Sequence, residues 1–155
     1  MRFIGNIEAK ADSKGRVFVP AIFRRTLQAG GVERLMMRKD IFQSCLVLYP
    51  EESWNRRVDE LRAQLDPWNG KDQSIFRKFV ANVEETTLDS NGRILIPKRY
   101  MTLVGIQQKV CFVGMDDTIE IWAKEKLEQP FMDAAIFGAE IERIMTEKKE
   151  DSNNG

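Results

Sequence analysis

A nine-residue phrase occurs twice in this chain of 155 residues, and it limits the possible folds more than any other feature. It reads Asp-Ser-Lys-Gly-Arg-Val-Phe-Val-Pro over residues 12–20 and Asp-Ser-Asn-Gly-Arg-Ile-Leu-Ile-Pro over residues 89–97. Every position of the second copy stands 77 residues after its counterpart. Because self-similarity at a fixed offset marks a duplicated structural unit, the phrase predicts one fold unit used twice.

Each copy has the composition of a tight turn that leads into a strand. The Asp can accept hydrogen bonds from the backbone two or three residues on, and the Gly supplies the positive φ of a bulged hairpin loop. The Arg then takes the first strand position, four residues after the Asp, where that carboxylate can orient it. The triplets 17–19 and 94–96 lack alternating polar residues, so both strands are expected to be covered on both faces. Pro20 and Pro97 end the strands and can open helices.

Two interpretations of the Arg stay open. Turn chemistry requires the Asp and the Gly, so a single copy would be explained by a hairpin with a solvated Arg. Turn chemistry does not require the Arg, and its recurrence directly after the Gly in both copies favours a guanidinium positioned for a task. Duplication without any role for the Arg is the alternative.

Both halves are predicted to fold as β-turn-β-α-β-β. A short helix follows each Pro and ends at glycine, over 21–28 in the first half and 98–104 in the second. Two strand candidates come after each helix, at 35–37 and 45–49 in the first half and at 110–113 and 118–122 in the second.

Helical segments close the halves. Apolar residues at steps of four, three and four predict a helix over 51–65, and a second helix is expected over 72–80. The segment 124–149 is helix-like, with interruptions expected at Pro130 and Gly138. The polar residues 148–155 are expected to fray. These elements predict a first repeat over 1–65, a linker helix over 66–81, a second repeat over 82–128, and a C-terminal helix with a polar tail over 129–155.

The doubled Asp-x-x-Gly-Arg hairpin, with its first copy close to the initiator Met, resembles the MraZ family, bacterial transcriptional regulators of the cell division and cell wall gene cluster. The resemblance runs from Arg2 through both repeats to the C-terminal helix, whereas a single copy would indicate only the wider AbrB and MazE type of domain. It implies an α+β fold, a pseudo-symmetric double swapped-hairpin β-barrel with flanking helices, assembled into a homo-oligomeric ring. It also implies that the motif Arg, here Arg16 and Arg93, contacts DNA.

Composition narrows the class of protein. The chain is 43% hydrophobic and can bury one core, but no apolar stretch approaches the roughly 18 residues that span a bilayer. The N-terminus turns polar at once, unlike a cleavable signal, so a cytoplasmic location is expected. The resemblance to a family of DNA-binding regulators implies that the protein is also associated with the nucleoid. Cys45 and Cys111 lie in apolar strand candidates and are expected to be buried hydrophobes rather than a disulfide or a nucleophile.

Several kinds of active site are excluded by the residues that are missing. The sequence has no His, so His-dependent triads are excluded, and two thiols are too few for a structural zinc site. Phosphate-loop and dinucleotide fingerprints are missing as well, so no metal or cofactor is expected. The sequence also holds two acidic pairs, at 84–85 and 116–117. On a strand, the two side chains of each pair would point to opposite faces, which favours solvated carboxylates over acid–base catalysis. The chain is therefore not expected to be an enzyme.

The net charge is the main objection to DNA binding, because 24 Lys and Arg balance 24 Asp and Glu. The charge is segregated, however. Residues 1–25 hold six cations and two anions, and residues 140–155 hold three cations and five anions. One basic face can therefore exist on a neutral molecule. In an oligomer several modest contacts would act together, which predicts binding to repeated elements of double-stranded promoter DNA.

The proposed contacts differ between the two copies. Arg16 is expected to fork onto guanine O6 and N7 in the major groove, with Lys14 on phosphate and the Gly15 backbone allowing close approach. Arg93 is expected to act likewise in the second copy. Asn91 replaces the Lys there and can contact a phosphate or an adenine, so the second hairpin is expected to bind more weakly or to read differently.

Asp12 and Asp89 are expected to shape the hairpins rather than touch DNA, because phosphate repels a carboxylate. Gly92 is also expected to shape its hairpin. Two rival functions stay open. One is an antitoxin-type dimeric repressor with one hairpin per chain. The other is a scaffold ring that binds protein instead of nucleic acid.

Overall fold

The computed structural model describes residues 1–127 and 131–154, and the chain forms two compact units, Met1–Glu125 and Lys126–Gly155. In the first unit, the two halves repeat one order of elements. The first half contains β1 (Asn6–Lys10), β2 (Arg16–Phe18), α1 (Ala21–Ala29), β3 (Leu35–Lys39) and β4 (Leu46–Pro50). The second half contains β5 (Glu84–Thr86), β6 (Arg93–Leu95), α4 (Lys98–Val104), β7 (Lys109–Met115) and β8 (Thr118–Ala123). The predicted β-β-α-β-β order is confirmed in both halves.

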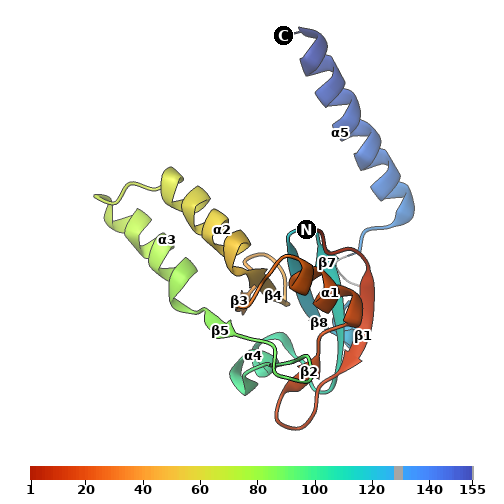
Figure 1. Ribbon diagram of the computed structural model, residues 1–155. Helices are drawn as coiled ribbons and strands as arrows, with labels where there is room; N and C mark the ends of the chain where they lie inside the picture. The colour runs from red at the N-terminus through yellow and green to blue at the C-terminus, as the bar shows by residue number, and fades with distance from the viewer. Residues whose placement is uncertain (128–130, 155) are drawn as a thin grey trace. The chain divides into compact units, whose positions relative to one another are not determined.

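The halves share their sheets. Six strands pair antiparallel in the order β1-β7-β8-β4-β3-β5, and β2 pairs with β6 in a separate two-stranded ribbon. The counterparts in the two halves are β1 and β5, β2 and β6, β3 and β7, and β4 and β8. When each strand is replaced by its counterpart, the pair β1–β7 becomes β5–β3, and the pairs β2–β6 and β4–β8 are unchanged. The set of strand pairs is therefore the same after the exchange. Figure 1 shows this sharing where β1, in red, runs beside β7, in cyan. The sequence repeat therefore corresponds to a pseudo-twofold pattern of strand pairing.

The ribbon of β2 and β6 lies with one face on the core and the other toward solvent. Val17 and Ile94 are each only 1% exposed, whereas Phe18 and Leu95 are 54% and 52% exposed. The expectation that these strands are covered on both faces was wrong. Because successive side chains of a strand point to opposite faces, a ribbon packed on one side leaves every second residue outside, even an apolar one.

A helical hairpin, α2 (Glu51–Gln64) followed by α3 (Gly70–Ala81), is inserted between the halves (Figure 1). The two predicted helices are confirmed, but α3 begins two residues earlier because the Asn69 side chain accepts a hydrogen bond from Asp72 N at 3.0 Å and caps it. The Trp54 ring of α2 stacks on the Phe79 ring of α3 with centroids 5.2 Å apart. This contact belongs to a small second core that also includes Val47 and Tyr49 of β4.

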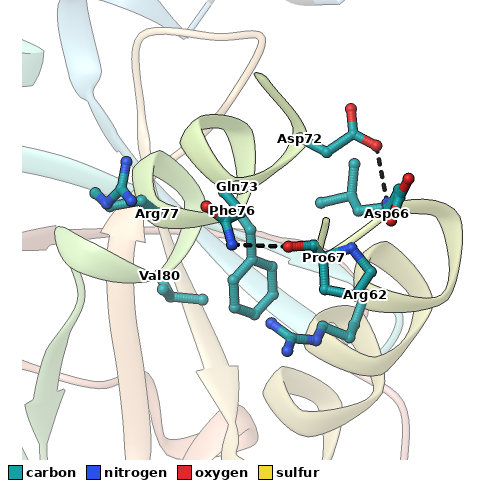
Figure 2. A pocket seen from close by; sticks show the side chains of 9 residues that line it. Arg62, Asp66, Pro67, Asp72, Gln73, Phe76, Arg77 and Val80 are labelled. Atoms are coloured by element: carbon teal, nitrogen blue, oxygen red, sulfur yellow. Dashed lines mark hydrogen bonds between the residues drawn. The ribbon is translucent and has the colours of Figure 1, made fainter. Parts of the chain in front are cut away.

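A pocket of about 360 Å³ lies at the turn between α2 and α3. Figure 2 shows the side chains that line it. The polar groups in this turn bond to one another. Asp66 N donates to Asp72 Oδ2 at 2.8 Å, and Gln73 Nε2 donates to the Pro67 carbonyl at 2.7 Å. These hydrogen bonds account for the shape of the turn.

The second unit contains α5 (Ala134–Asn154), and a one-turn 3-10 helix (Lys124–Lys126) spans the boundary between the units. The interruption expected at Gly138 was wrong, because a single helical Gly costs only about 1 kcal/mol relative to Ala. The helix continues to Asn154, and the fraying of residues 148–155 stays a prediction. Pro130 lies outside the described residues. In the described part of the chain, no helix is both long and apolar enough to cross a bilayer.

Candidate nucleic-acid interface

A carboxylate clamp holds the turn of the first hairpin. Lys14 N and Arg16 N each donate to Asp12 Oδ1 at 2.9 Å, and Arg16 Nε donates to Asp12 Oδ2 at 2.7 Å. These hydrogen bonds favour the charged form of the Asp12 carboxyl and so lower its pKa below the ordinary value. The largest contribution comes from the backbone N–H of Arg16. The clamp shapes the turn and orients the Arg16 guanidinium at the start of β2.

The second hairpin repeats the clamp atom for atom. Asn91 N and Arg93 N each donate to Asp89 Oδ1 at 2.9 Å, and Arg93 Nε donates to Asp89 Oδ2 at 2.9 Å. The pKa of the Asp89 carboxyl is lowered by the same cause, led by the backbone N–H of Arg93. Sequence duplication has therefore preserved the local geometry as well as the residues.

Both clamps leave the outer end of the guanidinium available. The carboxylate takes the Nε donor, and no described residue accepts a hydrogen bond from Nη1 or Nη2 of Arg16 or Arg93. Two terminal nitrogens of a fixed guanidinium form a planar fork of parallel donors. Such a fork matches two adjacent acceptors, as on a phosphate or on the O6 and N7 edge of guanine.

The ribbon brings the two forks to one face. In the β2–β6 register Arg16 is opposite Leu95 and Phe18 is opposite Arg93. Opposed residues, and residues two apart on one strand, point to the same side of a ribbon. The solvent face therefore carries two arginines and two apolar side chains in diagonal pairs, with the Arg93 guanidinium 5.7 Å from the centroid of the Phe18 ring.

Each hairpin is completed by the other half of the chain. Val19 N, from the first half, donates to the carbonyl oxygen of Gly92 at 3.1 Å, and Ile96 N, from the second, donates to the carbonyl oxygen of Gly15 at 2.8 Å. These reciprocal bonds join the end of each strand to the turn of its partner. The two turns are therefore parts of one structure.

The two turn glycines have positive φ, 92° at Gly15 and 83° at Gly92, but they face different neighbours. A Cβ on Gly15 would overlap the carbonyl oxygen of Ile96, whereas a Cβ on Gly92 would overlap the side chain of Arg24. The close approach that Gly15 permits in the structure is thus to the backbone of the other half. Its approach to DNA stays a prediction.

Arg24 is a cation at the second hairpin that the sequence reasoning missed. It lies on α1 and packs against Gly92, and its Nε is buried without a hydrogen-bond partner. Its counterpart in the second half is Met101 of α4, whose sulfur stands 3.3 Å from the position of a Cβ on Gly15. Extending the offset of 77 from the phrase into the following helix would have revealed this difference.

The acidic pairs are tied to arginines rather than simply solvated. In the first pair, Glu84 contacts Arg99, and Glu85 accepts from Arg34 Nε at 2.7 Å. In the second pair, Asp117 accepts from Arg56 Nη2 at 3.1 Å, which fastens α2 to the turn between β7 and β8. Because each of these carboxylates has an arginine partner, their contacts are structural.

The two thiols are buried as predicted. Cys45 and Cys111 are free and 0% and 1% exposed, and burial raises the pKa of both thiols, so they pack as hydrophobes. Within residues 1–127 and 131–154, no group of three His, Cys, Asp or Glu is arranged to hold a metal ion.

Two clamped arginine hairpins on one ribbon, built from both halves of the chain, define a duplicated α+β protein with a double-hairpin face. A family model described as "MraZ protein, putative antitoxin-like" matches residues 3–73 and again residues 79–144, one motif in each match. The chain belongs to the MraZ family. The predicted repeat and the resemblance are both confirmed.

Close relatives cover almost the whole chain. A protein named transcriptional regulator MraZ from Bacteroides fragilis is 60% identical over 154 residues, 99% of this chain and 98% of the relative. One of the same name from Bacteroides thetaiotaomicron is 59% identical over 148 residues, 96% of this chain and 95% of the relative. A third from Clostridium tetani is 34% identical over 146 residues, 94% and 97% of the two chains. These names describe regulators rather than enzymes.

Proposed function

We propose that this protein is a sequence-specific, DNA-binding transcriptional regulator that reads double-stranded promoter DNA with both hairpins. The observation that carries the proposal is the placement of Arg16 and Arg93 on one face of one ribbon, each held by an Asp and each with a free fork. The major groove of B-DNA admits a two-stranded β-ribbon. The relatives named transcriptional regulators support a regulatory role.

The proposed DNA contacts follow from the side chains on the solvent face of the β2–β6 ribbon. The forks of Arg16 and Arg93 donate to guanine O6 and N7, and Lys14 meets a phosphate beside the first turn. At the second turn, Asn91 stands at the position that corresponds to Lys14 and contacts a phosphate or an adenine. Phe18 and Leu95 lie between the forks, where apolar side chains suit thymine methyl groups.

The wider setting belongs to the same proposal. The halves form a double swapped-hairpin β-barrel, several copies form a ring, and the ring places hairpins on successive promoter repeats of the cell division and cell wall gene cluster. The protein acts in the cytoplasm, at the nucleoid. Because effective concentration multiplies weak contacts, a ring of neutral subunits can bind tightly without a basic net charge.

Fluorescence anisotropy with DNA from upstream of the gene cluster tests this function. Arg16→Ala and Arg93→Ala should each cost about 1–3 kcal/mol of discrimination between this DNA and scrambled DNA. Arg77→Ala, an exposed arginine on α3, is the matched control and should bind like the wild type. Full affinity in the double variant Arg16→Ala/Arg93→Ala would refute the proposal.

One phrase in the family description, "antitoxin-like", favours a second candidate, the antitoxin-type dimeric repressor. That candidate requires a mass of two chains and one hairpin per chain on DNA. Light scattering of the free protein separates it from a ring. A ring without affinity for the DNA would instead support the protein scaffold.

A further inference from the structure

A groove of about 1020 Å³ opens between α3, α4 and the connection from β3 to β4. Apolar side chains line it, and several of them are open to solvent. Ile41, Ile75 and Leu103 are 57%, 44% and 52% exposed, and Leu61, Phe79 and Tyr100 lie beside them. Within the unit Met1–Glu125, the groove is therefore apolar and open to solvent.

Cations surround this apolar lining. Five basic side chains line the groove against one carboxylate, Asp40; they are Arg38, Lys39, Lys71, Lys78 and Arg99. Arg99 is already paired with Glu84. The groove therefore favours an occupant that is both apolar and acidic.

Arg38 gives an independent sign that an occupant is missing. Its side chain is 8% exposed, and its guanidinium lies 5.0 Å from the centroid of the Phe79 ring. Nη1 donates to the Lys39 carbonyl, but Nε is buried without a hydrogen-bond partner, and no ion pair among the described residues includes Arg38. Because burying an unpaired charge is costly, this arginine points to an anionic group on the occupant of the groove.

Helix α5 has the complementary surface. Phe137, Ile141, Ile144 and Met145 follow the spacing i, i+4, i+7, i+8 and are 46–63% exposed, so they form one apolar stripe. At 100° per residue, Glu140 and Glu147 border one edge of the stripe and Glu142 the other. The helix holds five acidic and three basic residues. It is an amphipathic helix whose apolar stripe is bordered by carboxylates, of which Glu140 and Glu147 are paired with Arg143 on the same helix.

We propose that α5 of a second copy lies in this groove, with its stripe on the apolar lining and its carboxylates toward the basic rim. An amphipathic helix in an apolar groove is a common recognition mode, with anchors at i, i+4 and i+7. The proposal rests on the self-association within the proposed function and not on DNA contact. Because groove and helix are different surfaces, the contact is heterologous, and repeating it closes a ring when the rotation allows.

Cysteine cross-linking between separately made variants tests the contact. We expect Ile75→Cys mixed with Ile141→Cys to give a disulfide-linked pair of chains under mild oxidation. Both substituted residues are exposed, so the fold should survive. The wild type is the background, since its two cysteines are buried.

Three results would overturn the proposal. A linked pair from Ile141→Cys alone, at a higher yield than the mixture, would mean that α5 pairs with another α5. A disulfide within one chain of the double variant, with none in the mixture, would place α5 in its own groove. The lack of any cross-link would show that the groove does not receive α5.

The mass of the assembly, measured without DNA, gives a second test. Ile141→Asp should raise the dissociation constant of self-association at least tenfold. Ile136→Asp on the same helix lies off the stripe and is an equally exposed control, which should assemble like the wild type. A monomeric wild type would refute the proposed ring itself. An oligomeric wild type with an unaffected Ile141→Asp would refute only this interface.

Discussion

The two hairpins have the same clamp in different surroundings. In the first, Arg16 has a side chain 39% exposed and Lys14 beside it in the turn. In the second, the Arg93 side chain is 24% exposed and lies near the Phe18 ring, while Asn91 stands at the lysine position. Duplication has kept the residues that build the turn and has changed those around it. The comparison teaches that two turns of equal shape can have different surroundings.

The comparison also corrects a simple expectation about charge. Judged by Asn91 alone, the second hairpin lacks a cation, yet Arg24 from the first half packs against its turn. Each hairpin thus has one cation besides its motif arginine. They differ in placement, because Lys14 stands in the exposed turn, whereas the Nε of Arg24 is buried behind the turn. The difference in binding between hairpins should therefore be moderate.

The largest difference is expected between Gly15→Ala and Gly92→Ala. Positive φ costs both variants about 1–2 kcal/mol. Gly15→Ala also forces a Cβ against the backbone of Ile96, which should add about 1–3 kcal/mol, whereas the long side chain of Arg24 can move away from Gly92→Ala. Urea unfolding measures the free energies. Equal losses would show that the surroundings of the two turns are energetically alike.

The next effect concerns the motif arginines on DNA. Within the range of about 1–3 kcal/mol for a bidentate guanine contact, Arg16→Ala should cost more discrimination than Arg93→Ala, because Arg16 is freer to reach a base. Affinities for repeat and scrambled DNA, measured at one salt concentration, decide this. The same two substitutions can be compared in a Phe18→Ala background. Removal of the Phe18 ring should free Arg93 and narrow the difference in cost between Arg16→Ala and Arg93→Ala. A greater cost for Arg93→Ala would reverse the ranking of the hairpins.

Smaller effects are expected from the accessory cations. If Lys14 meets a phosphate, Lys14→Asn should lower the slope of log affinity against log salt by about 0.9. Asn91→Lys should raise it by a similar amount, and Arg24→Met, which copies Met101, should lower it if Arg24 also reaches DNA. Salt titrations of the three variants provide the comparison. An unchanged slope for Arg24→Met would leave Arg24 as a packing residue only.

The smallest effect should appear in acid. The pKa of both clamp carboxyls is below the ordinary 3.8, so their charged form stabilises the folded hairpins. This stabilisation is complete above about pH 5 and is lost as the pH falls through the ordinary value and then the lowered values. Asp12→Asn and Asp89→Asn should be less stable than the wild type at neutral pH, and the gap should narrow below the ordinary pKa. A gap that stays constant in acid would exclude the carboxylate charge as its source.

Local features were predictable from the sequence and distant contacts were not. The repeat predicted the order of strands, and the spacing of Asp12 and Arg16 anticipated the clamp, because both depend on residues close in the chain. The exposure of Phe18 depends on which strand pairs with β2 and which face meets the core. The contact between Arg24 and Gly92 joins different halves, so no local pattern reveals it.

The reciprocal bonds between Val19 and Gly92 and between Ile96 and Gly15 have a consequence for synthesis of the protein. The first hairpin is translated early but cannot be completed until residue 96 has left the ribosome. β3 lacks its partner β5 until residue 86 has emerged, and β1 lacks its partner β7 until residue 115 has emerged. Contacts between distant residues slow folding, so the nascent chain carries unpaired strand edges for most of its translation. The face formed by the two hairpins therefore cannot exist until most of the chain has been synthesised.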